Sequence, residues 1–436
     1  MRITVIGCGY LGATHAACMA ELGHEVLGLE IDELKRKTLE KGEVPFHEPG
    51  LPDLLSKHVA SGQLRFTDSF EEAADFGDIH FICVGTPQAK RGLGADLSYV
   101  FGAVEALAPH LTRPTLVVGK STVPVGTAAA LAAKLEQLAP VGAQAEIAWN
   151  PEFLREGYAV KDTLTPDRLV FGVSSAQAEQ QLRDFYGDIL ALGTPLVVTD
   201  FATAELVKVS ANAFLATKIS FINAVAEVCD ATGGDVVALA DAIGHDNRIG
   251  RRFLNAGIGF GGGCLPKDIR AFVHRAGELG VEDAMGFLRE IDEINQRLRT
   301  RAVSIVEGRL GNLAGARIGV LGVAFKPDSD DVRDSPALNI AGQLHLRGAT
   351  VSIHDPEAIE NSRKIFPTLN YVNDPLEACA DADMVLHLTE WKAYRAIDPA
   401  ALGEIVAQKQ ILDGRNALDP QVWKDAGWDY RGFGRR

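Results

Sequence analysis

The sequence lacks an excess of basic residues. Its 436 residues include 43 Lys and Arg but 58 Asp and Glu, which gives a formal net charge of −15 at pH 7. Nucleic acids and anionic membrane surfaces repel a chain of this charge. We therefore expect neither a nucleic-acid partner nor a membrane partner, and any phosphate group that binds must be held by a local structural device.

Cysteine is also scarce, and the six cysteines are widely separated, at Cys8, Cys18, Cys83, Cys229, Cys264 and Cys379. No CxxC pair and no Cys/His cluster with zinc spacing occurs, so no metal site is predicted. So few cysteines in a chain of this length predict no disulfide framework and favour the reducing cytoplasm. Residues 1–20 could pass for a short signal peptide, but the spacing of their glycines favours another interpretation, given below. No other stretch reaches ~18 uninterrupted apolar residues, so no membrane-spanning helix is expected.

The composition itself is that of a folded globular protein, with 47% hydrophobic and 23% charged residues. The length predicts about two to four domains. In the N-terminal part, helical segments alternate with short apolar strands, which are predicted at residues 2–6, 25–30, 79–84 and 115–119. This alternation predicts a parallel sheet with helices on both faces.

The pattern changes at Phe201. Residues 201–231 carry apolar positions at helical spacing without Pro or Gly, which predicts one long helix. A second α/β unit follows, with a helix predicted at 335–347 and strands at 317–325, 349–356, 381–388 and 409–416. The predicted fold class is therefore α/β, with two Rossmann-like doubly wound domains joined by a central helical region that contains a long helix. The predicted domains span residues 1–199, 200–300 and 301–436.

A glycine-rich motif, GCGYLG, begins at Gly7, after the first predicted strand and before the first helix. In such a turn Gly7 permits the tight bend, Gly9 lets a pyrophosphate approach the backbone, and Gly12 lets the helix pack against the strand. Glu30 ends the second strand, where a carboxylate accepts hydrogen bonds from an adenosine ribose and repels a 2′-phosphate, so NAD is favoured over NADP. The same spacing recurs from Gly257, but no buried strand leads into that copy, so we do not interpret it as a dinucleotide site.

Residues 257–268, GIGFGGGCLPKD, combine dense glycine with a cysteine at a helix start. Dense glycine exposes backbone N–H groups and allows a ligand to come close, and Pro266 suits the first helical position. A cysteine just before a helix forms a thiolate more readily, so Cys264 is a candidate nucleophile, and Asp268 is a candidate to orient or deprotonate a water. The alternatives are that Cys264 is a small buried hydrophobic residue and that Asp268 only complements the helix dipole.

Other polar residues share a helical face or follow predicted strands. Lys208 and Asn212 are four apart, so both project from one side of the long helix, where a buried pair can polarise a substrate oxygen; an ordinary exposed charge is the alternative. Glu152 and Glu156, in NPEFLREG, suit acid/base work or the start of a helix. Thr122, in KSTVPVG, follows another strand, at the edge where open α/β sheets bind ligands.

A further polar group follows the first strand of the second α/β unit. It consists of Phe325, Lys326 and Arg333. These residues are candidates to clamp phosphates or a base, and an ordinary surface loop is the alternative.

These segments together resemble the UDP-glucose 6-dehydrogenases, which belong to the nucleotide-sugar 6-dehydrogenase family. The resemblance is carried by GCGYLG, KSTVPVG, NPEFLREG, LVKVSANAFLATKISFINAV, DNRIGRRFLNAGIGFGGGCLPKD, GVAFKPDSDDVRDSPA, HDP, TEW and DGRN. It runs from the first strand to near the last residue, and the block around the cysteine is its most specific element. It implies a Rossmann domain for NAD, a long central helix at a dimer interface, and a second α/β domain that helps to hold the nucleotide.

The resemblance also implies a reaction, the oxidation of the primary alcohol of UDP-glucose to the carboxylate of UDP-glucuronate with two NAD. An aldehyde has no hydride to lose until something adds to it. Cys264 would add to form a thiohemiacetal, hydride transfer would give a thioester, and water would cleave it. Lys208 and Asn212 would stabilise the charge that develops on the oxygen, a kind of contribution worth ~3–4 kcal/mol per donor in other enzymes.

Residue roles follow only where this sequence matches the family motifs. The implied catalytic residues are Cys264, Lys208, Asn212, Asp268, Glu152 and Thr122. The implied NAD contacts are Gly7, Gly9, Tyr10, Leu11, Gly12, Glu30, Lys35, Thr86, Thr122, Glu156 and Arg333. The implied substrate contacts are Glu152, Phe153, Leu154, Lys208, Asn212, Asn255, Gly259, Phe260, Gly261, Phe325 and Lys326, and Arg248 would reach the substrate of a neighbouring subunit. The implied partners are a nucleotide sugar and further copies of the chain, in a homodimer or higher homo-oligomer.

The sequence departs from the family pattern at three places. Gly263 stands where the family usually has Ser, Glu30 stands where it usually has Asp, and residues 88–96 are less typical. These departures leave the reaction class intact but leave open the same chemistry on dTDP-glucose, GDP-mannose or UDP-N-acetylmannosamine. A non-catalytic NAD-binding scaffold and a two-electron hydroxyacid dehydrogenase are the competing hypotheses from other classes, and the latter would not need Cys264.

Overall fold

The computed structural model describes residues 1–435. Contacts within the chain divide it into two compact units, residues 1–211 with 274–279, and residues 212–273 with 280 onward. Each unit contains one β-sheet. The three-part division predicted from the sequence stays a prediction.

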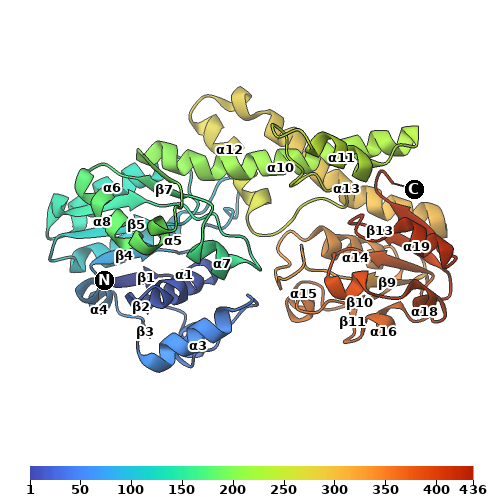
Figure 1. Cartoon of the computed structure of the whole chain (residues 1–436), viewed down its shortest axis with the longest axis horizontal. Coiled ribbons are helices and arrows are strands. Elements are labelled where there is room, and N and C mark those ends of the chain that lie inside the picture. The colour runs from blue at the N-terminus through green and yellow to red at the C-terminus, as the bar shows by residue number, and fades with distance from the viewer. Residues whose placement is uncertain (436) are drawn as a thin grey trace. The chain divides into compact units, whose positions relative to one another are not determined.

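The first unit has an eight-stranded sheet in the order β3-β2-β1-β4-β5-β6-β7-β8 (Figure 1). Its strands are β1 Arg2–Ile6, β2 Glu25–Leu29, β3 Leu64–Thr67, β4 Ile79–Ile82, β5 Thr115–Gly119, β6 Ala145–Trp149, β7 Leu169–Gly172 and β8 Leu196–Thr199. Its helices are α1 Tyr10–Glu21, α2 Glu33–Glu40, α3 Leu51–Ser61, α4 Phe70–Phe76, α5 Ser98–Leu107, α6 Thr127–Leu138, α7 Ala159–Leu164, α8 Ala176–Phe185 and α9 Gly187–Ala191, with 3₁₀ turns at Ala108–His110 and Gly142–Gln144. The four strands predicted in this part of the sequence are confirmed.

Helices cover both faces of this sheet because successive strand residues point to opposite sides. Val5 of β1 belongs to a buried cluster with residues of α1, α3 and α8, whereas the next residue, Ile6, belongs to a cluster with residues of α4, α5 and α6. Phe81 and Ile82 of β4 divide in the same way. The strands therefore read as continuous apolar runs, as expected for a doubly wound sheet.

One strand pair departs from the parallel pattern. β6 pairs antiparallel with β7, where Trp149 lies opposite Gly172, whereas the other neighbouring pairs are parallel. The connection at residues 150–168 therefore leaves and re-enters the sheet at the same edge. That edge is the carboxyl end of the first six strands, where open α/β sheets bind ligands. The antiparallel step thus keeps the NPEFLREG segment at the ligand-binding edge.

The long helix predicted at 201–231 is confirmed as α10, Phe201–Thr232, which is unbroken in Figure 1. Three further α-helices follow it, α11 Val236–Gly244, α12 Leu265–Glu278 and α13 Phe287–Leu310, with a 3₁₀ turn at Glu282–Met285. Among residues 1–435, α10 is the one helix whose length and apolar composition would allow it to cross a membrane, and 44% of its most apolar window is buried inside the fold. Because core helices share these properties, this is weak evidence for a membrane span.

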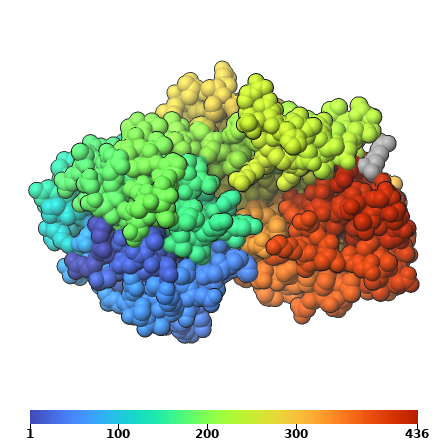
Figure 2. All heavy atoms as spheres, viewed as in Figure 1, coloured from blue at the N-terminus to red at the C-terminus, as the bar shows by residue number. Residues whose placement is uncertain are grey.

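The second unit has a six-stranded parallel sheet in the order β11-β10-β9-β12-β13-β14. Its strands are β9 Arg317–Leu321, β10 Thr350–His354, β11 Asn370–Tyr371, β12 Met384–His387, β13 Gln410–Asp413 and β14 Asp429–Gly432. Its remaining helices are α14 Pro336–Leu346, α15 Ile359–Ile365, α16 Pro375–Cys379, α17 Lys392–Arg395, α18 Pro399–Gly403 and α19 Pro420–Asp425. The orange and red atoms of this sheet and its helices pack as one continuous body in Figure 2.

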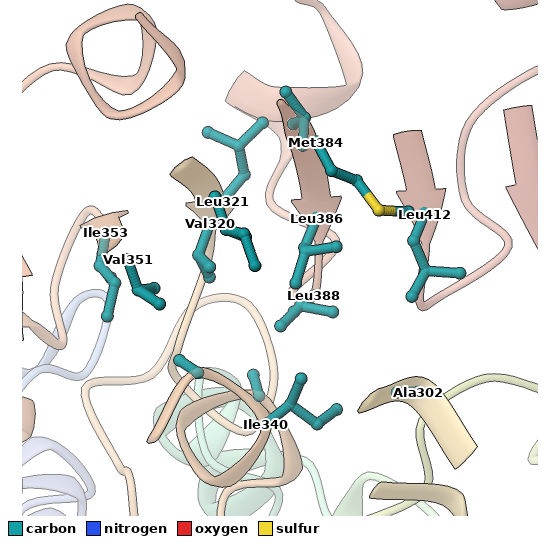
Figure 3. Close-up of a cluster of buried hydrophobic side chains, with 14 of the residues drawn as sticks. Ala302, Val320, Leu321, Ile340, Val351, Ile353, Met384, Leu386, Leu388 and Leu412 are labelled. Carbon is teal, nitrogen blue, oxygen red and sulfur yellow. The ribbon is translucent and has the colours of Figure 1, made fainter. Parts of the chain in front are cut away.

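The core of this sheet is apolar. Figure 3 shows side chains from β9, β10, β12 and β13, among them Val320 and Leu386, that face Ile340 of α14 and Ala302 of α13. All four residues are almost completely buried. At about 25 cal/mol per Å² of apolar surface, such burial is the main source of stability of this sheet.

The strand predicted at 317–325 is shorter than expected, because β9 ends at Leu321. Gly322 has a φ of +94°, and a Cβ there would lie 2.4 Å from the Cβ of Thr389, so the chain turns away from the sheet at a position only glycine can occupy. The next two backbone N–H groups, of Val323 and Ala324, donate to the carboxylate of Asp355 at 2.7 and 2.9 Å instead of to a strand. The sequence predicted a longer strand because residues 323–325 are all apolar.

The second sheet repeats part of the strand order of the first, since β9 to β14 follow each other in space as β1 to β6 do. The first turns correspond as well. The Gly7 N–H donates to the Leu29 carbonyl at 2.9 Å, and the Gly322 N–H donates to the His354 carbonyl at 2.9 Å. Both glycines have positive φ, so the same strand-turn geometry occurs once in each unit.

Candidate functional site

The dinucleotide motif lies where β1 turns into α1. Gly7 has a φ of +88°, a conformation that strains other residues. A Cβ on Gly12 would lie 1.9 Å from the Gly7 carbonyl oxygen, whereas a Cβ on Gly9 would meet nothing within 4 Å. Within residues 1–435 no side chain caps the first turn of α1, which begins with Tyr10 and Leu11, so its backbone N–H groups suit a phosphate ligand.

Glu30 is fixed beside this turn. Its Oε2 accepts a hydrogen bond from the Cys8 backbone N–H at 3.1 Å, and its Oε1 accepts one from the Asp32 N–H at 3.0 Å. The Nζ of Lys35 lies 3.4 Å from Oε2. A buried carboxylate at the end of β2, next to an uncapped helix start, fits a ribose and a pyrophosphate. The residues present therefore fit NAD.

Two further contacts join segments that were predicted to touch NAD. The Thr86 hydroxyl donates to the Thr122 carbonyl at 2.8 Å, which links the segments after β4 and β5. The Tyr10 hydroxyl donates to the buried carboxylate of Glu48, which also accepts the Gly157 N–H at 2.7 Å. Burial and this hydrogen bond raise the pKa of Tyr10 well above its usual range. Glu48 thus ties the start of α1 to the end of NPEFLREG, the segment that contains the predicted contact Glu156.

Glu152 lies in the connection after β6. Its Oε1 accepts hydrogen bonds from the backbone N–H groups of Phe153 and Leu154 at 2.7 and 2.8 Å. Its Oε2 lies 3.2 Å from the Nζ of Lys120. The Nζ of Lys208, on α10, lies 5.4 Å from the centroid of the Phe153 ring. The first unit therefore brings a carboxylate, an aromatic ring and a second lysine to one place at the carboxyl edge of its sheet.

Cys264 lies in the second unit, immediately before α12. Its carbonyl accepts the Asp268 N–H at 3.0 Å, which closes the first turn of the helix. Cys264 is exposed, whereas the other five cysteines are buried, so the alternative of a small buried hydrophobic residue is wrong. Pro266 is the second helical residue rather than the predicted first.

Asp268 holds two other polar side chains. It is only 2% exposed. Its Oδ2 accepts a hydrogen bond from the Asn212 amide at 2.6 Å, and its Oδ1 pairs with the Lys267 ammonium at 2.6 Å. Burial of a carboxylate is costly unless such partners are present. Asp268 therefore does more than complement a helix dipole, because it connects α12 to Asn212 on α10, one turn beyond Lys208.

The glycines of the loop before Cys264 are explained largely by packing of the second unit against itself. A Cβ on Gly259 would lie 2.3 Å from Oδ1 of Asn295, and a Cβ on Gly261 would lie 2.5 Å from the carbonyl oxygen of Asp334. The Phe260 N–H also donates inside the unit, to Asn295 at 2.8 Å. At these positions the chain itself is the close neighbour of the glycine, and contact of the loop with a substrate stays a prediction.

Gly263, the residue before Cys264, makes room for an arginine. A Cβ there would lie 2.3 Å from Cζ of Arg333. The guanidinium donates to Asp331 at 2.7 to 3.0 Å, and the same carboxylate accepts the Gly263 N–H at 3.3 Å. Arg333 was predicted to contact NAD, and the structure places it beside the backbone that leads into Cys264.

Phe325 and Lys326 also lie at the glycine loop. The Lys326 Nζ is 5.5 Å from the centroid of the Phe325 ring, and a Cβ on Gly262 would lie 2.9 Å from that ring. Arg415 donates to the carbonyls of Gly259 and Phe325 at 2.8 and 3.0 Å, which fixes the loop and the segment after β9 together. Phe325 and Lys326, two of the predicted substrate contacts of the second unit, therefore lie at the loop.

Arg248 and Asn255 have other neighbours. Arg248 is exposed and pairs with Asp246 at 2.7 Å. The Asn255 Oδ1 accepts a hydrogen bond from Arg251 at 2.8 Å. These contacts do not join either residue to Cys264, and the role of Arg248 at a neighbouring subunit stays a prediction.

Several supporting residues had no role predicted from the sequence, namely Glu48, Lys120, Asn295, Asp331 and Arg415. Lys120 directly follows β5, and Arg415 lies two residues after the end of β13, so their place near the carboxyl ends of strands was a usable signal. Asn295 lies within α13 and carries no local signal. Within residues 1–435 no group of three or more His, Cys, Asp or Glu residues is placed to hold a metal ion.

Comparison with known proteins matches the whole chain. Three domains of the UDP-glucose/GDP-mannose dehydrogenase family match the chain. They are the NAD binding domain at residues 1–190, the central domain at residues 202–297 and the UDP binding domain at residues 319–420. The UDP-glucose 6-dehydrogenase of Rhizobium meliloti (strain 1021) is 41% identical over 439 residues, which cover 100% of both chains. The UDP-glucose 6-dehydrogenase TuaD of Bacillus subtilis (strain 168) is 39% identical, over 100% of this chain and 93% of its own.

The solved structures agree with this pattern. A UDP-glucose dehydrogenase from the hyperthermophilic archaeon Pyrobaculum islandicum has a TM-score of 0.91 and 38% sequence identity. The match covers 100% of this chain and 98% of that one. The similarity therefore includes the glycine turn, the long helix and the cysteine loop in a single alignment of both units.

Proposed function

Because the chain belongs to the UDP-glucose/GDP-mannose dehydrogenase family, we propose that it oxidises UDP-glucose to UDP-glucuronate. The observation that carries the proposal is full-length similarity, at 41% identity, to a protein named UDP-glucose 6-dehydrogenase. The family also makes the chain an NAD-dependent oxidoreductase, and the turn at Gly7 with the carboxylate of Glu30 fits that cofactor.

NAD supplies the oxidising chemistry, because two NAD⁺ accept one hydride each while CH₂OH and one water become a carboxylate and three protons are released. The sulfur of Cys264 forms a bond to the aldehyde carbon after the first oxidation, and its thiol proton passes to the new oxygen or to a base. After the second oxidation the product is a thioester. Water then attacks the thioester carbon, the carbon–sulfur bond breaks, and the thiol is restored. The exposure of Cys264 supports this role.

The remaining residues act on charge and water. Lys208 and Asn212 lie one turn apart on α10 and are proposed to stabilise the negative oxygen formed when sulfur adds. The buried Asp268 orients Asn212 through the 2.6 Å hydrogen bond and is proposed to assist the attacking water. Glu152 is proposed as a second carboxylate for proton transfer, supported by its fixed position beside Phe153.

We also propose that the protein self-associates through α10. Phe214, Phe221 and Val228 recur every seven residues and are 67%, 53% and 61% exposed. Seven residues are two helical turns, so these side chains form an apolar stripe on one face. An exposed apolar stripe of this kind is typical of a helix that packs against a partner. A second copy of the chain is the proposed partner.

The test of the reaction is a panel of nucleotide sugars offered with NAD and with NADP. NADH formation is followed by absorbance and the sugar product by mass spectrometry. We expect UDP-glucose with NAD to react fastest and to yield two NADH per sugar. We expect NADP to be a poor substitute because Glu30 repels a 2′-phosphate.

Each other outcome points to a different function. A faster reaction with dTDP-glucose, GDP-mannose or UDP-N-acetylmannosamine would keep the chemistry and change the substrate. One NADH per sugar would indicate a two-electron dehydrogenase. NAD binding without turnover of any sugar would indicate a scaffold.

A further inference from the structure

A buried lysine that the reaction scheme does not use lies behind Glu152. Lys120 directly follows β5, where its backbone N–H donates to the Ile82 carbonyl at 3.0 Å. Its side chain is only 4% exposed. Burial of an ammonium disfavours folding unless each charge and donor finds a partner. The partners of Lys120 therefore indicate why the fold keeps a lysine at this position.

The three N–H donors of the ammonium are matched by three oxygens. Its Nζ lies 3.0 Å from Oδ1 of Asn150, 3.4 Å from the hydroxyl of Tyr186 and 3.2 Å from Oε2 of Glu152. Burial lowers the pKa of Lys120, but the nearby Tyr186 and Glu152 outweigh this effect and hold the pKa above its usual value. The three oxygens therefore stabilise the charged form of the side chain.

Two of these partners form a rigid frame that does not depend on Glu152. The Tyr186 hydroxyl donates to Oδ1 of Asn150 at 2.7 Å, and the Asn150 amide donates to the Val170 carbonyl at 3.0 Å. Both side chains are buried. The frame thus joins the residue after β6 to β7 and to Tyr186, which lies between α8 and α9, and its two contacts with Lys120 fix the position of the ammonium.

Both carboxylate oxygens of Glu152 have partners. One carboxylate oxygen is capped by the N–H groups of Phe153 and Leu154, and the other faces Lys120. Glu152 and Lys120 also line the same cavity of about 30 Å³, together with His15 and Tyr186. Without the ammonium, the second oxygen would lose its charged partner and the side chain would be free to turn about its last torsion.

We infer that Lys120 is a positioning residue for the oxidation: it holds the Glu152 carboxylate in a single orientation at the ligand-binding edge of the first sheet. The inference deepens the proposed function and rests on the role proposed there for Glu152. It predicts that Lys120 contributes to turnover only through that carboxylate. A lysine retained merely for stability would contribute independently of it.

The test is a double-mutant cycle on the full-length protein, with Lys120→Met, Glu152→Gln and the double variant. We expect Lys120→Met to lower kcat for UDP-glucose oxidation at least tenfold and to change the KM for NAD less than threefold. In the Glu152→Gln background the same substitution is expected to change kcat less than twofold, because no carboxylate remains to be held. Lys120→Arg, which keeps the charge, is expected to restore part of the lost kcat.

Two results would overturn the inference. One is a Lys120→Met variant with kcat within twofold of the parent, and the other is an equal loss of kcat in both backgrounds. If Lys120→Met alone does not fold, the double variant removes both charges of the buried pair, and a comparison of it with Glu152→Gln decides the question. Failure of the parent protein to oxidise UDP-glucose would instead refute the proposed function, so the two failures are distinguishable.

Discussion

Cys264 and Asp268 are about one helical turn apart, but Cys264 is exposed and Asp268 is buried. The buried carboxylate of Asp268 is bound by Asn212 and Lys267. The difference follows from their positions, because Cys264 precedes α12 and Asp268 points from its first turn into the unit. Exposure fits the covalent role proposed for Cys264, and burial fits the role proposed for Asp268 in orienting Asn212.

Replacement of Cys264 by Ala is expected to abolish UDP-glucuronate formation while NAD binding stays within about twofold of the parent. The physical reason is that the aldehyde has no other thiol to capture it, while the glycine turn that fits NAD is unchanged. Product analysis and NAD titration by fluorescence measure the two effects. Cys229→Ala, a buried cysteine of the same unit, is the matched control and should still form the acid. Unchanged NADH production by Cys264→Ala would exclude the covalent route.

A second residue-scale prediction concerns acid stability. Burial lowers the pKa of His80 from 6.5 to about 3, with a smaller effect from Arg113, and its ring nitrogen is 2.6 Å from the Thr4 hydroxyl. Between pH 3 and 6.5, His80 binds a proton in the unfolded chain but not in the folded chain. The free energy of unfolding should therefore fall as the pH drops through this window, by up to about 1.4 kcal/mol per pH unit from this group.

His80→Gln removes that titration. We expect the variant to be less stable at pH 8, because the buried site is altered, but to show a shallower decline between pH 6.5 and 3. Urea unfolding at a series of pH values measures the slopes. Between pH 7 and 9 the two proteins should have parallel slopes, since the ring is neutral in both states. Identical slopes in the acid window would contradict the assignment.

At the scale of elements, turns and helix starts determine where the candidate residues lie. β9 ends at Leu321, and the N–H groups that follow Gly322 are bound by Asp355, which keeps the segment leading to Phe325 out of the sheet. Ser335 is the N-cap residue of α14. Its hydroxyl donates to the Val323 carbonyl at 2.7 Å and accepts the Leu338 N–H at 3.2 Å, so one buried side chain satisfies the helix and the turn together.

Ser335→Ala is therefore expected to lower the free energy of unfolding by about 1–2 kcal/mol, the usual cost of losing a helix cap. Urea denaturation followed by circular dichroism measures the loss. Ser304→Ala, an exposed serine within α13, is the control and should change stability by less than about 0.5 kcal/mol. Equal effects of the two substitutions would show that the cap contributes nothing special.

At the scale of the whole molecule, the chain repeats one architecture in two units. The strand order of the second sheet matches that of β1 to β6 in the first, and in both units a glycine of positive φ follows the first strand. The two glycine turns differ in how many of their backbone N–H groups are bound by the carboxylate that follows the second strand. Glu30 accepts one N–H of the first turn, whereas Asp355 accepts two of the second turn. The N–H groups of the second turn are therefore already bound inside the unit, and the first turn is the one that fits NAD.

The proposed self-association is testable at this scale. Phe221→Glu places a charge in the centre of the apolar stripe on α10, where burial in an interface would be costly. Light scattering after gel filtration should show a dimer or larger assembly for the parent and a monomer for the variant. Leu346→Glu, at an exposed leucine of α14, is the control and should keep the parent mass. A monomeric parent at micromolar concentration would contradict the proposal.

Local sequence was sufficient for the glycine turn at Gly7, for the strands around it and for α10, because backbone conformation and hydrophobic period are encoded within a few residues. It was not sufficient for the reason behind Gly259 or for the frame around Lys120. Those depend on Asn295 and on Tyr186, which are distant in sequence and meet their partners only when the chain packs. Contacts over such separations are decided by the tertiary structure, since no local period or motif records which side chains will share a buried space.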